Sequence, residues 1–135
     1  MSGRDLELAK KFYRGLGAAD PSVLLDVLHP GFRAKVAAGL PHGWGGTYES
    51  AREMLERCWA RVFASLDIRP IPEEYLPSGP ERLVVLGRYV GAGRSTGRKL
   101  DAAFAHVLRF RDGRITELIQ ITDSAHWHEA LRPSG

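Results

Sequence analysis

The sequence lacks the features that mark several common classes of protein. It has a single cysteine, Cys58, which excludes a disulfide within the chain and agrees with a reducing compartment. No apolar run approaches the roughly 20 residues that a membrane-spanning helix needs, and the first residues contain no apolar signal core. We therefore expect a cytoplasmic protein with no membrane partner.

The charged residues and histidines also lack the clustering that other kinds of partner require. The net charge is +3, but the basic residues of segments 94–99 and 109–114 fall at opposite ends of one predicted hairpin. A nucleic-acid groove needs such residues along one path, interleaved with aromatic side chains. His42, His126 and His128 have no further ligand at a convincing spacing for a metal. We expect no nucleic acid, no metal and no cofactor.

The stretch over residues 99–127 is the most strongly patterned part of the chain and predicts a long β-hairpin. Two runs rich in Val, Ile, Leu, Phe and Thr flank Asp112-Gly113, which favours a type I′ turn. With these residues at the centre of the turn, His106 faces Ile119. The same face then carries Phe104, Glu117, Ile121 and Asp123. An apolar wall with a few titratable groups is typical of a small-molecule pocket.

One alternative register stays open. Leu118 and Ile119 are adjacent apolar residues that break the alternation of the second strand. A single extra residue between Ile115 and Ile121 would turn Asp123 to the opposite face.

The rest of the sequence predicts three helices and three further strands. Helices are expected over residues 5–16, from an Asp20-Pro21 start to residue 28, and from a Ser50/Glu53 capping box to residue 66. Strands are expected over residues 32–38, 67–76 and 82–93, the second at an edge because it contains two prolines. A glycine-rich loop (39–47) precedes the third helix, and a last helical turn is possible over 126–131. This order predicts one α+β domain over residues 1–135, a cone of three helices on a strongly curved, mostly antiparallel sheet.

This order and several sequence words resemble the nuclear transport factor 2-like superfamily, and within it the SnoaL-like polyketide cyclase branch, which is related to ketosteroid isomerases. The words are GRYVGAG (87–93), TG (96–97), FAHVLRFRDGRI (104–115), QITD (120–123) and the loop GLPHGWGGTYES (39–50). The resemblance spans most of the chain. It implies the fold but no single activity, because the superfamily includes isomerases, cyclases, dehydratases, epoxide hydrolases and proteins that are not enzymes.

The resemblance also implies roles for individual residues. In ketosteroid isomerase relatives an acidic oxyanion-hole donor occupies the place of His106, and a tyrosine on the first helix, matched by Tyr13, assists it. Those enzymes need a carboxylate base near the end of the first strand, where this chain has only Val and Ala at 36–38. In the cyclase branch a carboxylate on the last strand is the general acid/base, and Asp123 occupies that place. The implied catalytic set is Asp123 as acid/base and His106 as oxyanion donor, with Tyr13 or Tyr48 assisting.

Each of these roles has a purely structural alternative. Asp is a favoured N-cap, so Asp123 could instead begin the last helical turn. A single histidine within an apolar strand could be an ordinary hydrogen-bonded core residue, and Glu117 could be solvated at the open end of the strand. In the simple register His106 and Asp123 are separated by about 13 Å along the strand, too far for a direct hydrogen bond.

Aromatic and polar side chains on the predicted inner surfaces are candidates for substrate contact. Arg88 and Tyr89 alternate, so only one of them can point inward. The candidate substrate-binding residues are Trp44, Tyr48, Trp59, Arg88, Tyr89, Phe104, Glu117 and Ile121.

The predicted function is a cofactor-independent cyclase, isomerase or lyase that acts by general acid–base catalysis on a hydrophobic, carbonyl-bearing small molecule, such as a polyketide or other natural-product intermediate. One alternative is an epoxide-opening enzyme, which would pair Asp123 with Asp101 or Glu117. The other is a module that binds small molecules or dimerises without chemistry. The convex face (Ala105, Val107, Leu118, Gln120) is moderately apolar, and relatives pair through such faces, so we expect a homodimer.

Overall fold

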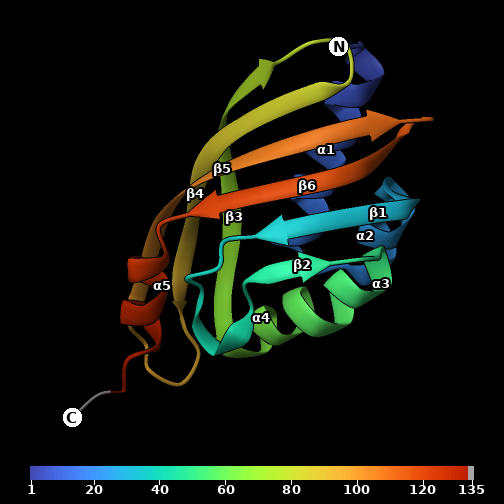
Figure 1. The fold of residues 1–135 in the computed structure, drawn as a ribbon. Helices are drawn as coiled ribbons and strands as arrows, with labels where there is room; N and C mark the ends of the chain where they lie inside the picture. The colour runs from blue at the N-terminus through green and yellow to red at the C-terminus, as the bar shows by residue number, and fades with distance from the viewer. Residues whose placement is uncertain (134–135) are drawn as a thin grey trace.

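Helices pack against one side of a single curved sheet (Figure 1). A computed structural model describes residues 1–133. The helices are α1 (Gly3–Gly17), α2 (Pro21–Val27), a third helix made of α3 (Ala51–Met54), the π-helical turn η2 (Leu55–Trp59) and α4 (Ala60–Ser65), and α5 (Ser124–Leu131); a short 3₁₀ turn, η1, spans Pro41–Gly43. The sheet is curved but not closed. The predicted α+β cone is confirmed.

The sheet has six strands in the order β2-β1-β6-β5-β4-β3. They are β1 (Leu28–Val36), β2 (Gly46–Tyr48), β3 (Leu66–Pro77), β4 (Arg82–Gly93), β5 (Lys99–Arg111) and β6 (Arg114–Thr122). Every neighbouring pair is antiparallel except β1 and β6, which run parallel. The proline-containing β3 lies at an edge, as predicted. The short β2, inside the glycine-rich loop, was not predicted.

Local hydrogen bonds explain where two of the helices begin. Asp20 Oδ1 accepts from the backbone N–H groups of Ser22 (3.1 Å) and Val23 (3.4 Å), and Pro21 stands at the first position of α2. Ser50 Oγ accepts from the N–H of Glu53 at 3.0 Å. The Glu53 carboxylate in turn accepts from the N–H of Glu49 at 3.0 Å, one residue before the cap. Both predicted helix starts are confirmed.

The hairpin turn forms as predicted, but the pairing of residues beyond it differs from the simple register. Asp112 and Gly113 have φ values of 53° and 73°, and Arg111 pairs with Arg114. Phe110 then pairs with Ile115 whereas Arg109 pairs with Glu117, so Thr116 is an extra residue on β6. Its hydroxyl donates to the carbonyl oxygen of Arg109 at 3.2 Å.

This bulge exchanges the two faces of β6. His106 pairs with Gln120 and not with Ile119, so the simple register is wrong and the alternative with one extra residue is right. Leu118 and Gln120, predicted on the convex face, are buried beneath the sheet, and Ile119 and Ile121 face outward.

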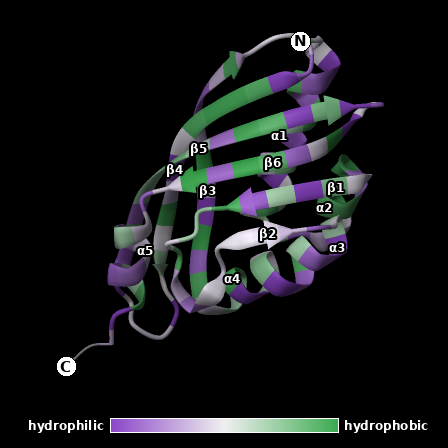
Figure 2. Cartoon of the chain, viewed as in Figure 1, coloured by the Kyte–Doolittle hydropathy of each residue, from purple (hydrophilic) through white to green (hydrophobic). Residues whose placement is uncertain are grey.

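The outer face of the sheet is uncovered by any described helix and turned toward the viewer in Figure 1. It carries a group of apolar side chains that we call the outer patch: Val84, Leu86, Ala105, Val107, Ile119 and Ile121. Ile121 has 62% of its surface exposed. Figure 2 shows hydrophobic residues along β4, β5 and β6, with hydrophilic residues between them. Among the described residues, no helix combines the length and the hydropathy needed to cross a bilayer.

Candidate functional site

A buried histidine held by two tyrosines lies beneath the middle of the sheet. His106, on β5, has no exposed surface. Its Nδ1 lies 2.8 Å from the hydroxyl of Tyr13 on α1, and its Nε2 lies 2.8 Å from the hydroxyl of Tyr89 on β4. Both ring nitrogens are therefore satisfied by side chains that come from distant parts of the chain.

Aromatic stacking fixes the plane of this imidazole. The Phe104 ring is stacked on it at a centroid distance of 4.1 Å, and the Tyr13 ring is nearly parallel to it at 5.7 Å. The Tyr89 ring is tilted against Phe104 at 4.8 Å. The hydrogen bonds and the stacking together leave the His106 ring one orientation.

Burial keeps every member of this group neutral at ordinary pH. Desolvation lowers the pKa of His106 to about 3, because the imidazolium form cannot be solvated there. Desolvation also raises the pKa of Tyr13 and of Tyr89 well above the usual tyrosine value, since it disfavours the phenolate. The site thus contains one neutral imidazole and two protonated phenols.

The number of protons on these three side chains limits the directions of their two hydrogen bonds. A neutral imidazole has one N–H and one acceptor nitrogen, so one tyrosine donates to the ring and the other accepts from it. In the described part of the chain, His106 is the sole hydrogen-bond partner of either hydroxyl. Tyr89 borders the pocket described below and Tyr13 does not, so only the proton of Tyr89 has a further acceptor within reach, and we assign Tyr13 as the donor to Nδ1. Nε2–H then donates to Tyr89, whose own O–H proton stays available for a further acceptor.

Tyr89 borders a pocket between the sheet and the helices. Apolar side chains make most of its wall, including Leu16, Leu40, Trp59, Val62, Phe63 and Trp127. Cys58 also lines it, and burial raises the pKa of that thiol to about 11, so it stays protonated. Trp59 and Cys58 lie in the π-helical turn η2, whose extra residue changes the direction of the side chains that follow it.

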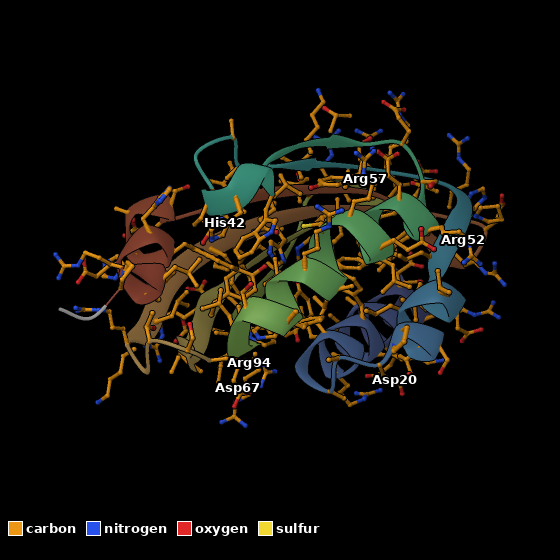
Figure 3. The ribbon with its side chains drawn as sticks, turned by 90° about the horizontal axis from the view of Figure 1, so that it is seen from below. Asp20, His42, Arg52, Arg57, Asp67 and Arg94 are labelled. Carbon is orange, nitrogen blue, oxygen red and sulfur yellow. The ribbon has the colours of Figure 1, made fainter. Side chains whose placement is uncertain are left out.

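The pocket has a second polar residue and little free space. Gln120 on β6 is 6% exposed and lines the pocket, and its side-chain amide has no hydrogen bond to any described residue. The cavity volume is about 20 Å³, room for about one water molecule. Figure 3 shows side chains filling the space between the helices and the sheet. A larger ligand therefore enters only when wall side chains move.

Comparison with known proteins identifies the family. Residues 9–118 match the family described as the SnoaL-like domain. The chain belongs to the SnoaL-like domain family. The resemblance predicted from the sequence is thereby confirmed. No curated protein matches the sequence.

Solved structures share the SnoaL-like fold over nearly the whole chain. An NTF2-like protein of unknown function from Burkholderia pseudomallei is 29% identical, with a TM-score of 0.85 over 97% of this chain and 98% of that one. TerC, co-crystallised with polyporic acid, is 26% identical, with a TM-score of 0.84 over 96% and 98%. A protein from Jannaschia described as a candidate SnoaL-like polyketide cyclase is 19% identical, with a TM-score of 0.83 over 100% and 98%, and shows the fold alone.

Asp123 of this SnoaL-like domain is not in the pocket. It follows β6 as the first residue before α5, and its side chain is 46% exposed. The carboxylate lies 3.4 Å from His126 Nε2 and makes no capping hydrogen bond. The prediction that Asp123 shares the inner face with His106 is wrong, because the extra residue Thr116 turns the end of β6 over.

Three further candidates for substrate contact lie outside the pocket. Arg88 is paired on the outer face with Asp101 at 2.7 Å, so Tyr89 is the inward member of that pair of neighbours. Glu117 lies 4.0 Å from Arg109, and Ile121 is exposed. The carboxylates of Asp101, Glu117 and Asp123 therefore do not converge in the pocket, as an epoxide-opening enzyme would require.

The remaining candidates are buried in the interior of the SnoaL-like domain. Tyr13, Tyr89 and Phe104 surround His106, and Trp59 lines the pocket. Trp44 packs edge-on against Trp127 at 6.4 Å, and the Tyr48 hydroxyl donates to the Trp44 carbonyl at 2.6 Å. Tyr48 thus braces the loop and is not bonded to His106. The catalytic roles themselves stay predictions.

Sequence reasoning missed Gln120 and Trp127 as pocket residues. The simple register predicts Gln120 on the convex face, and its true place follows from the bulge after Ile115. Trp127 is on α5, and its indole N–H donates to Thr122 Oγ1 at 3.0 Å. The break in alternation at Leu118 and Ile119 was the one signal that could have revealed Gln120.

The proton count can be checked by nitrogen NMR of the histidine rings. We expect His106 to be a neutral imidazole with its proton on Nε2 between about pH 5 and pH 8, because its pKa is about 3 and Tyr13 donates to Nδ1. Long-range ¹H–¹⁵N spectra distinguish the two tautomers directly. Tyr13→Phe removes the donor to Nδ1 and serves as the control, in which the Nδ1 signal should move. A wild-type spectrum with the proton on Nδ1 would contradict the assignment.

Proposed function

We propose that this domain binds a hydrophobic, carbonyl-bearing small molecule, of the polyketide or other natural-product type, and acts on it as a cofactor-independent cyclase or isomerase. One observation carries the proposal: Tyr89, bonded to the fully buried His106, is at the wall of an apolar pocket. The family match and the co-crystallisation of TerC with polyporic acid support a small-molecule role.

In the proposed mechanism Tyr89 stabilises negative charge on the substrate oxygen. Its free O–H donates to the carbonyl oxygen, and the hydrogen bond strengthens as an enolate or alkoxide develops. The N–H of His106 donates to Tyr89 and makes its hydroxyl a better donor. Because burial raises the pKa of Tyr89, the phenol stays protonated and remains a donor throughout.

The proposal assigns no general base to the protein. None of the described carboxylates lines the pocket. A proton that leaves the substrate would therefore pass to solvent or to another group of the substrate. This differs from the acid–base role expected of Asp123, which lies at the surface.

A pair of ligands that differ in a single oxygen tests the proposed contact. 2-Tetralone has a carbonyl group that the hydrocarbon tetralin lacks, and both are bicyclic and apolar. We expect the ketone to bind more tightly than the hydrocarbon by about fivefold, the value of one net hydrogen bond. Tyr89→Phe should abolish the difference while tetralin binding is unchanged, as measured by tryptophan fluorescence titration. An equal preference for the ketone in Tyr89→Phe would refute the contact.

The second candidate function is a binding module without chemistry. The same lack of a lining carboxylate favours it. A domain of that kind would bind 2-tetralone with the Tyr89-dependent preference but would not accelerate exchange of its α-protons.

We also propose that two copies associate through the outer patch, in which Ile121 is the most exposed side chain. In a two-fold dimer each substitution changes the interface twice. Ile121→Arg should therefore weaken the dimer by about a hundredfold or more, because it brings two desolvated positive charges together. Sedimentation velocity over a concentration series measures this. Ala64→Arg adds the same charge at an exposed helix position and should have no effect; a dimer of Ile121→Arg with wild-type affinity would rule out this interface.

A further inference from the structure

The amide of Gln120 is a buried polar group without a protein partner. Its side chain is more than nine-tenths buried, it lines the pocket, and it forms no hydrogen bond with any described residue. A buried amide without a partner is costly, and most are hydrogen-bonded to protein or water. Yet none of the fully buried side-chain polar atoms in the described residues is without a partner. The amide of Gln120 is therefore not fully enclosed by the protein, and the pocket that Gln120 lines is the place where a ligand can reach it.

The pocket thus has two polar groups of different character. Tyr89 offers one O–H donor, and its oxygen is already used by His106. Gln120 offers both an N–H donor and a carbonyl acceptor. The two residues come from different strands, β4 and β6, on either side of β5. They are held by the sheet, so they address two separate points of one ligand.

The walls between these two groups limit the rest of the ligand. Trp59, Trp127 and Tyr89 present aromatic rings, and the Tyr89 and Trp127 rings meet edge to face at 5.1 Å. None of the charged side chains described in the structure lines the pocket. An ionic group would be desolvated there without a counter-charge, which is strongly unfavourable. A flat, uncharged, apolar body is what these walls accept.

We infer that the pocket selects a neutral, flat, largely aromatic molecule with two oxygens. One is a carbonyl or phenolic oxygen that accepts from Tyr89, and the other is a hydroxyl or second carbonyl that bonds to Gln120. Gln120 is then the residue that determines specificity, because it distinguishes ligands with the second oxygen from those without it. The inference rests on the proposed function for the contact at Tyr89, but the contact at Gln120 can be tested independently of it.

A panel of naphthols tests the second contact. 2-Naphthol has one oxygen, and the isomeric dihydroxynaphthalenes place a second oxygen at different distances and angles from it. We expect at least one diol to bind the wild-type protein about fivefold or more tightly than 2-naphthol, since one added hydrogen bond to a buried amide is worth about that much. Calorimetry and tryptophan fluorescence give the affinities.

Variants at position 120 decide the assignment. Gln120→Leu and Gln120→Met keep the size of the side chain and remove the amide, and thermal unfolding checks that at least one is folded. In the folded variant the preferred diol should lose its advantage, while the affinity for 2-naphthol changes by less than about twofold. A diol preference that survives in the folded variant overturns the inference. So does a wild-type protein that binds no member of the panel.

The outcome is separable from that of the proposed function. Tyr89→Phe should weaken 2-naphthol and the diol alike and leave the ratio of their affinities unchanged. If Tyr89→Phe fails to alter the preference for 2-tetralone over tetralin while Gln120→Leu abolishes the diol preference, the proposed role of Tyr89 is wrong and the specificity of Gln120 stands. If instead Tyr89→Phe abolishes the preference for 2-tetralone while Gln120→Leu leaves the diol preference intact, the specificity of Gln120 is wrong and the proposed role of Tyr89 stands.

Discussion

Acid should destabilise the wild-type protein more steeply than a variant without the buried histidine, by about 1.4 kcal/mol of unfolding free energy for each pH unit between about 6.5 and 3. The folded-state pKa of His106 is lowered to about 3 from an ordinary value of 6.5 by desolvation. Above pH 6.5 the imidazole is neutral in both states and has no effect. Below it only the unfolded chain takes up the proton, so stability is lost as the pH falls, until the folded protein is protonated as well.

The comparison needs a variant that keeps the hydrogen bonds but does not titrate. His106→Gln has a donor and an acceptor that can face Tyr13 and Tyr89. Urea unfolding of both proteins at several pH values gives the difference in free energy, and contributions from carboxylates common to both cancel. A difference that is constant from pH 7 to pH 3 would mean that His106 does not remain neutral in the folded protein.

Tyr89→Phe should slow catalysis of enolisation by about 10²–10³-fold, the usual effect of removing one oxyanion donor. The exchange of the α-protons of 2-tetralone in D₂O, followed by NMR, measures enolisation without knowledge of the natural substrate. The phenyl ring keeps the packing against Phe104 and Trp127, so the loss comes from the hydroxyl.

Asp123→Asn is the matched comparison for the same assay. Its carboxylate is at the surface next to His126, so we expect a change within about twofold, as for most surface substitutions. A large loss in Asp123→Asn with little effect of Tyr89→Phe would restore the acid–base role implied by the family resemblance. No acceleration by the wild type, with normal binding of 2-tetralone, would indicate the binding module.

Signals that act over a few residues were enough to predict most of the elements. The Asp112-Gly113 dipeptide determines a turn by its own backbone preferences, and the caps at Asp20 and Ser50 are bonds between residues three or fewer positions apart. The register of β6 could not be predicted in the same way. Thr116 is stabilised as a bulge by pairing and by a bond to Arg109, seven residues away, and no local preference marks it.

The candidate site was harder to predict because its parts are distant in sequence. Tyr13 and His106 are 93 positions apart, and only the family resemblance predicts that they act together. The alternation of Arg88 and Tyr89 does not indicate which of the two side chains points inward, and only the pairing of β4 with β5 decides it. The predicted places of Asp123, Glu117 and Ile121 on the inner face are wrong together, because all three followed from the simple register.

The bulge at Thr116 also gives β6 one residue to spare. Loss of that single codon would place Glu117 directly after Ile115, with Phe110 still opposite Ile115 and Arg109 still opposite Glu117. Gln120 would therefore keep its inward direction and Ile119 and Ile121 their outward direction. Relatives whose β6 is shorter by one residue at this position should accordingly retain both the pocket residue and the apolar outer face.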